Sequence, residues 1–209
     1  MASQEKKWAA LLIVAVSILV VLIAQKTLRQ VQTHEADAAL ARTKGTAQAK
    51  VRIVEYVDFQ CPACANGADI LRNLFKDHPY DVYFEVKYFP LPTVHQHALK
   101  AAAYAECAAR QGKFWDFADK LMERQAQWKS LISAEPVFLQ IADEARLDRK
   151  KMDRCILQPE VKQKILDDKQ MGESLGVKST PTYFVNGKMM VGTKSLTEEL
   201  NEFFPPKAN

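Results

Sequence analysis

The segment Cys61-Pro-Ala-Cys64 constrains the fold of this chain more than any other, because of the patterns on either side of it. The preceding Val51–Val57 is apolar and rich in β-branched residues, which predicts a buried strand. After the cysteines, Ala63–Lys76 places apolar residues at helical spacing, and Val82–Phe89 has the pattern of a second strand. The two cysteines are therefore expected at a strand-to-helix junction within a β-α-β unit.

A series of helical segments follows this unit, and the chain ends with two short strands and a helix. The strands flank Asn186-Gly187, a dipeptide typical of a tight hairpin turn. This order, with a CxxC in its first unit, indicates an α/β chain with a thioredoxin-like fold and an inserted α-helical domain. The predicted boundaries are 49–92 and 176–209 for the thioredoxin-like domain and 93–175 for the helical insertion domain.

The N-terminal region contains an apolar run, Trp8–Ala24, whose single polar residue is Ser17. As a helix the run is about 25 Å long, close to the shortest length that spans a bilayer. A cleaved signal peptide is the alternative, but it needs small residues before the cleavage site, and Leu22 stands at −3 for cleavage directly after the run. We expect residues 1–24 to form an uncleaved signal anchor, a transmembrane helix, and residues 25–48 to form a tether.

The formal net charge of +4 is spread along the 209 residues without a basic block interleaved with aromatic residues, so we expect no nucleic-acid partner. We also expect no cofactor and no metal. A structural zinc site usually takes four ligands, and here one CxxC stands with the isolated Cys107 and Cys155. His95 and His97 could add ligands, so a metal-handling protein stays an alternative.

The position of the cysteine pair predicts different roles for its two thiols. Cys61 at a helix N-terminus faces unpaired backbone N–H groups and the positive end of the helix dipole, which lower the pKa of its thiol. We therefore expect Cys61 to be the attacking residue and Cys64, one turn further, to be the resolving residue. Pro62 suits the first helical turn because it has no N–H to lose there. An inert pair of thiols is the alternative.

Thr180-Pro181 falls between a predicted helix and a predicted strand. The proline could be trans in an ordinary turn or cis. In thioredoxin-like folds a cis-proline loop lies against the CxxC, and the backbone before it can pair with an extended substrate segment. We expect Thr180 and Pro181 to bind substrate in this way.

Three motifs in this order, VEYVDFQCPAC, QGKFWDF and LGVKSTPTYFVNG, resemble the DsbA family of bacterial thiol:disulfide oxidoreductases. The resemblance covers roughly Lys50–Phe204. It implies a thioredoxin fold with a helical insertion and activity on envelope proteins. It also implies that Cys61 and Cys64 are the redox pair and that Pro181 is the cis-proline.

The resemblance implies roles for further residues. Glu55, six residues before Cys61, takes the place of the family's buried acid, and Lys87 takes that of its companion lysine. The acid would relay the proton of the resolving thiol, and Lys87 would hold the charge of the acid; a strand Glu–Lys pair without a catalytic part is the alternative. Some members carry a second disulfide in the insertion, so we expect one between Cys107 and Cys155, with two buried free thiols as the alternative.

The chain also departs from the family pattern. Ala63 stands where the best-known member has a histidine between its cysteines, and because alanine cannot stabilise a thiolate we expect a less extreme oxidant. Thr180 before the proline occurs in several relatives, including isomerase-like ones. Residues 25–48 are too short to form the dimerisation domain of disulfide isomerases, so we expect a monomer.

The resulting hypothesis is a membrane-anchored thiol:disulfide oxidoreductase, acting as an oxidase on cysteine-containing envelope proteins. A membrane-bound, quinone-linked partner of the DsbB type would reoxidise it. Because disulfide formation needs an oxidising compartment, we expect a single-pass protein of the bacterial inner membrane whose catalytic domain faces the periplasm or cell exterior. Basic residues on both sides of the apolar run leave that orientation open. A disulfide reductase or isomerase of the same fold and a chaperone-like peptide-binding module are the alternatives.

Overall fold

The computed structural model describes residues 2–205 and, within the N-terminal helix, the side chains of Trp8, residues 13–29 and residues from Asp37 onward. The chain divides into two units, Met1–Asp37 and Ala38–Asn209. Helix α1 (Ala2–Ala41) accounts for the first unit and continues into the second.

The described residues include no helix that combines the length and the apolarity needed to cross a membrane. The transmembrane helix predicted over Trp8–Ala24 is therefore not confirmed. Residues 9–12 of this run lie outside the described side chains.

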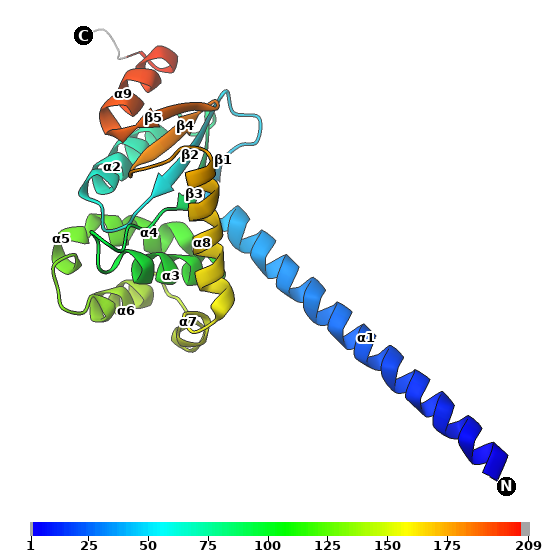
Figure 1. Cartoon of the computed structure of the whole chain (residues 1–209). Coiled ribbons are helices and arrows are strands. Elements are labelled where there is room, and N and C mark those ends of the chain that lie inside the picture. The colour runs from blue at the N-terminus through cyan, green and yellow to red at the C-terminus, as the bar shows by residue number, and fades with distance from the viewer. Residues whose placement is uncertain (1, 206–209) are drawn as a thin grey trace. The chain divides into compact units, whose positions relative to one another are not determined.

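A five-stranded mixed sheet lies among the helices of the second unit, with strand order β1-β3-β2-β4-β5 (Figure 1). Strands β2 and β3 are parallel, as the predicted β-α-β unit requires, and the other pairs are antiparallel. The strands are β1 (Thr43–Gly45), β2 (Val51–Val57), β3 (Val82–Tyr88), β4 (Thr182–Val185) and β5 (Lys188–Val191).

The edge strand β1 corrects the prediction of a tether over residues 25–48. Residues 43–45 pair with β3, with Thr43 opposite Glu85, and both Ala38 and Arg42 are buried. The second unit therefore begins at Ala38 rather than near residue 49. A three-residue strand is too short to show an apolar alternation, so its sequence gives no signal.

Different helices cover the two faces of the sheet. They are α2 (Pro62–Asp77), α8 (Pro159–Ser174) and α9 (Gly192–Phe203). Side chains alternate along a strand, so Tyr183, paired in register with Glu55, lies on the face opposite Tyr56. Helix α2 approaches Tyr183 through Gly67, and α9 packs against α2 and β4. Helix α8 approaches Tyr56 through Gly172, where an added Cβ would lie only 2.7 Å from the tyrosine ring.

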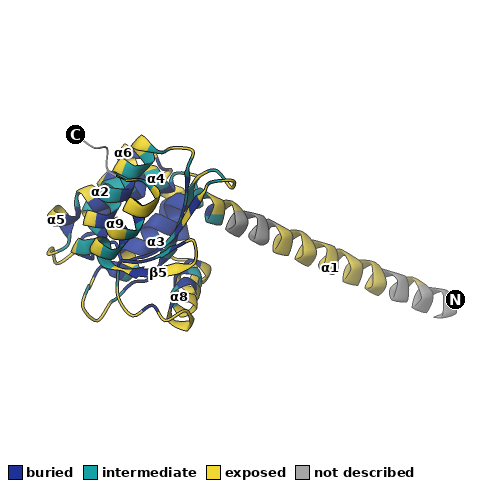
Figure 2. Cartoon of the chain, turned by 90° about the horizontal axis from the view of Figure 1, so that it is seen from above, coloured by how far each residue is buried: buried dark blue, intermediate teal, exposed yellow. Residues whose placement is uncertain are grey.

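The inserted helices gather beyond one end of the sheet (Figure 1). They are α3 (Ala98–Ala109), α4 (Phe114–Glu123), α5 (Gln125–Trp128), α6 (Glu135–Glu144) and α7 (Arg149–Cys155). Helix α3 is buried along most of its length (Figure 2). Helix α8, which the predicted boundaries place wholly in the insertion, also packs against β3.

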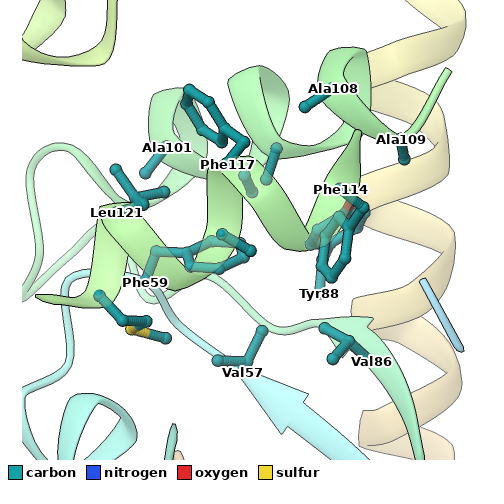
Figure 3. Close-up of a cluster of buried hydrophobic side chains, with 14 of the residues drawn as sticks. Val57, Phe59, Val86, Tyr88, Ala101, Ala108, Ala109, Phe114, Phe117 and Leu121 are labelled. Carbon is teal, nitrogen blue, oxygen red and sulfur yellow. The ribbon is translucent and has the colours of Figure 1, made fainter. Parts of the chain in front are cut away.

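One continuous core joins the sheet to the insertion beside the cysteine pair. Phe59, 3% exposed, lies between Val57 of β2 and the α4 side chains Phe117 and Leu121 (Figure 3). Its ring centroid is 6.5 Å from that of Phe114 in an edge-on arrangement. Burial of a phenylalanine side chain contributes about 1.5–3 kcal/mol, so this contact fixes the cysteine segment against both parts of the fold.

The structure joins Cys107 of α3 to Cys155 of α7 in a disulfide, the pairing expected from the family resemblance. The two residues are 48 positions apart. In the chain-entropy account, closing a loop of this length stabilises the folded state by about 4 kcal/mol.

A buried ionic cluster ties the segment before β1 to the helices. Arg42 donates from Nη1 to Asp168 Oδ2 of α8 at 2.7 Å, and its Nε lies 3.8 Å from Glu106 Oε2 of α3. All three side chains are at most 4% exposed. Arg110 and Lys164 bring two further positive charges to the same acids.

Candidate active site

The two cysteines of the CxxC lie at the start of α2, and both are thiols here. Cys61 is the N-cap residue, in an extended conformation, and Pro62 is the first helical residue. The N–H groups of Cys64 and Ala65 donate to the Cys61 carbonyl at 3.1 and 3.3 Å. Cys61 is 8% exposed and Cys64 is completely buried, so of the two residues Cys61 alone retains some exposed surface.

The backbone leading to Cys61 is fixed by buried polar side chains. Asp58 accepts from the N–H of Gln60 at 2.8 Å and from that of Leu91 at 2.9 Å. Gln125 of α5 donates through Nε2 to the carbonyls of both Phe59 and Cys61, at 2.8 and 2.9 Å. The insertion therefore contacts and positions the backbone of Cys61 directly. Sequence reasoning missed Gln125, because a glutamine more than sixty positions away carries no signal of this contact.

The surroundings of Cys61 favour its thiolate. The Cys64 thiol, the Thr180 hydroxyl and the backbone N–H groups of Cys64 and Ala63 lower the pKa of Cys61 from 9.0 to about 5, against the opposing effect of burial. In the dithiol the Cys61 thiol donates to the Thr180 carbonyl oxygen at 3.3 Å, a hydrogen bond that the thiolate cannot make. Ala63 thus contributes through its backbone although its side chain cannot.

We expect the thiolate absorbance of the reduced protein near 240 nm to titrate with a midpoint near pH 5. The pKa of Cys61 is depressed on folding, so ionisation of Cys61 stabilises the folded dithiol form. This stabilisation is fully present above about pH 9 and is lost as the pH falls through about 5. The oxidised protein, which lacks this thiolate, is the control. A midpoint near 9 would contradict the assignment.

Cys64 and Glu55 are both buried, and burial favours the protonated form of each. Burial, the hydrogen bond to Cys61 and the charge of Glu55 raise the pKa of the Cys64 thiol well above 9.0. Burial raises the pKa of Glu55 from 4.5 to about 8, the nearby Tyr183 hydroxyl opposes this, and the Cys61 charge adds to it. The carboxyl also lines a mainly apolar cavity of about 80 Å³ between the sheet, α2 and α4. A carboxyl that titrates near neutral pH beside a high-pKa thiol can exchange a proton with it.

The structure contradicts the role expected for Lys87. Its register partner on β2 is Tyr56, so it lies on the face of the sheet opposite Glu55. The Lys87 ammonium instead pairs with Glu85 on its own strand, 2.6 Å away. Lys87 is therefore no companion of the buried acid.

The remaining predicted site residues fall in two places. The Thr180–Pro181 peptide is cis and lies against Cys61, as the substrate-binding prediction requires. The Cys107–Cys155 disulfide belongs to the insertion. Among residues 2–205, no group of three or more His, Cys, Asp or Glu side chains is placed to hold a metal ion. His95 pairs with Asp58, 2.9 Å away.

Several solved structures have a fold similar to that of this chain. A thioredoxin-like oxidoreductase from Silicibacter pomeroyi superposes with a TM-score of 0.63 at 26% identity, covering 80% of this chain and 92% of that one. The fold is also similar to that of Wolbachia pipientis alpha-DsbA1, with a TM-score of 0.67 at 21% identity, covering 78% of this chain and 88% of that one. Bacillus subtilis BdbD gives a TM-score of 0.67 at 21% identity, covering 77% of this chain and 91% of that one.

Curated relatives include much longer proteins. The chain is 34% identical over 145 residues to the Na(+)/H(+) antiporter NhaA 3 of Salinispora tropica, a match that covers 69% of this chain. The chain spans about a fifth of the length of the curated relatives it matches.

The fold, a thioredoxin fold interrupted by helices, resembles that of the DsbA-type proteins above, and it carries a cysteine pair at the start of α2. The family model described as Thioredoxin matches residues 39–203. The chain belongs to this thioredoxin family.

Proposed function

We propose that this protein is a protein-thiol oxidase that transfers the Cys61–Cys64 disulfide to cysteine-containing proteins of the cell envelope. The observation that carries the proposal is the asymmetry of the two sulfurs. Cys61 can be reached, lies 3.3 Å from the Thr180 carbonyl and has a low pKa, whereas Cys64 is enclosed. A reduced form stabilised by a thiolate makes its disulfide the more oxidising.

The exchange takes two displacements. A substrate thiolate attacks Cys61 Sγ, the Cys61–Cys64 bond breaks, and the Cys64 sulfur leaves with the electron pair and takes a proton from Glu55. The second substrate thiol, as a thiolate, then attacks the mixed disulfide and expels Cys61 as a thiolate. Two electrons pass from the substrate, which gains a disulfide, to the enzyme, which becomes a dithiol. A membrane-bound quinone-linked protein of the DsbB type would return the enzyme to the disulfide.

Thr180 and Pro181 would hold the substrate during this exchange. The carbonyl of Thr180 stands beside the reactive sulfur, and an extended segment can add its backbone to such an edge. A substrate held there would present its cysteine to Cys61 rather than to the enclosed Cys64.

The proposed location is the bacterial inner membrane, with the catalytic unit on the periplasmic or outer side. The apolar run Trp8–Ala24 supports an anchor by its length and composition, and disulfide formation supports the oxidising side. A phosphatase fused after Asn209 should be active; activity only of a cytoplasmic reporter at that position would contradict this orientation.

The reduction potential of the Cys61–Cys64 pair tests the direction of the chemistry. We expect equilibration with glutathione to give a potential above that of thioredoxin, about −270 mV. The protein should then oxidise a reduced, unfolded substrate faster than it reduces insulin. A potential at or below the thioredoxin value, with efficient insulin reduction, would favour the reductase or isomerase alternative.

A further inference from the structure

Glu55 has a partner that replaces the expected lysine. Tyr183 of β4 is its direct cross-strand partner on β2, and paired side chains of adjacent antiparallel strands lie about 5 Å apart at Cβ. Tyr183 is completely buried and Glu55 is 4% exposed. Buried polar groups are normally hydrogen-bonded, so the Tyr183 phenol and the Glu55 carboxyl are natural partners for each other.

Gly67 makes room for the tyrosine hydroxyl. A Cβ added to Gly67 would lie 2.0 Å from Tyr183 Oη and 3.3 Å from its Cζ. Gly67 follows Cys64 by three residues on α2, so the two lie on the same buried face of that helix. The hydroxyl is thus set between the acid and the helix that carries the resolving thiol.

The charges of these groups are coupled. Burial raises the pKa of Tyr183, and the charges of Glu55 and Cys64 raise it further. Neither Glu55 Oε1 nor Tyr183 Oη makes a hydrogen bond of full geometry with any described residue of the dithiol structure. Leaving the Tyr183 hydroxyl and the Glu55 carboxyl buried without a hydrogen bond costs free energy, and a hydrogen bond between them removes that cost. The bond is strongest when Glu55 is ionised.

We infer that Tyr183 is a positioning residue for Glu55. The Tyr183 hydroxyl lies opposite Gly67 and hydrogen-bonds the Glu55 carboxylate, which accepts the Cys64 proton. This inference rests on the proposed function. In the resolution step Glu55 takes the Cys64 proton, the Cys64 thiolate attacks Cys61 Sγ, and the bond from Cys61 to its partner breaks. The partner leaves as a thiolate with the electron pair. The phenol keeps its own proton throughout.

The test follows this step in the full chain with oxidised glutathione as the partner. Quenched flow and mass spectrometry measure how fast the Cys61–glutathione mixed disulfide is resolved between pH 6 and 10. In the wild type the rate should rise with a midpoint below 8, because the pKa of Glu55 is about 8 in the dithiol and the mixed disulfide lacks the Cys61 charge that helps to raise it. In Tyr183→Phe the midpoint should move to higher pH, because the hydroxyl lowers that pKa. The rate at pH 7 should fall roughly three- to tenfold, the equivalent of one hydrogen bond.

Further variants separate this role from packing. In Glu55→Gln the rate of resolution should no longer rise with pH. Adding Tyr183→Phe to Glu55→Gln should cause no further change in that rate. Gly67→Ala should shift the midpoint as Tyr183→Phe does. The double variant Gly67→Ala/Tyr183→Phe should be more stable than Gly67→Ala alone, because it lacks the Tyr183 hydroxyl oxygen that would lie 2.0 Å from the new Cβ.

Tyr88→Phe is the matched control, because Tyr88 also carries a buried hydroxyl that donates to a buried acid, Glu106, at 3.1 Å. Its midpoint should equal that of the wild type. An unshifted midpoint in Tyr183→Phe, or equal shifts in both tyrosine variants, would overturn the role of Tyr183 while leaving the oxidoreductase assignment intact. A wild type that forms no mixed disulfide at all would instead overturn the proposed function.

Discussion

Replacing Cys61 with serine is expected to abolish thiol–disulfide exchange, with a loss of roughly 10³-fold or more in the rate of substrate oxidation. Cys61 is the sulfur that a partner can reach and the one whose pKa is lowered to about 5. A serine hydroxyl cannot form the mixed disulfide, and the enclosed Cys64 cannot substitute for it. Oxidation of a reduced, unfolded protein by the oxidised enzyme measures the loss.

Cys64→Ser provides the complementary result. This variant keeps the attacking thiolate but cannot close the internal disulfide, so mixed disulfides through Cys61 should accumulate and be visible on a non-reducing gel. A double Cys107→Ala/Cys155→Ala variant is the control: it should oxidise substrate at a near-normal rate in conditions where it remains folded. Substantial exchange by Cys61→Ser would refute the assignment of the nucleophile.

Local patterns account for most of the correct predictions. Val51–Val57 was predicted by its β-branched apolar residues and is strand β2 over that same range. The cysteine pair follows from the junction of that strand with a helix, and the hairpin from Asn186-Gly187, whose residues both have positive φ. Each of these features is encoded within about ten consecutive residues, where periodicity and turn chemistry act.

The misses all involve contacts between distant segments. Lys87 was expected to hold the charge of Glu55 but lies on the other face of the sheet, because one position along a strand reverses the direction of a side chain. Tyr183 can be recognised as a neighbour of Glu55 only from the register of their two strands, and Glu55 lies more than a hundred positions earlier in the sequence. Arg42, within a segment predicted as a tether, meets Asp168 across 126 positions. A single sequence gives no information on register or on such pairings.

The cluster around Arg42 leads to the largest expected effect on stability. Arg42→Ala should lower the free energy of unfolding by about 3 kcal/mol or more, the usual cost of removing one partner from a buried ion pair. Among the residues that the structure describes, the variant leaves Asp168 and Glu106, at most 4% exposed, with only Lys164 and Arg110 as cationic partners. It also removes the guanidinium that lies 4.8 Å above the ring of Tyr88. Urea unfolding of the oxidised protein measures the change.

Lys44→Ala is the matched control, two residues further along the same segment. Lys44 also pairs with an acid, Asp119, at 3.3 Å, but both side chains are about one-third exposed, and such pairs contribute at most about 1 kcal/mol. If the two variants lost similar stability, the Arg42 cluster would not hold the segment before β1 to the domain. A large loss confined to Arg42→Ala would mean that the catalytic unit depends on residues from Ala38 onward, and a truncation at residue 49 should then fail to fold stably.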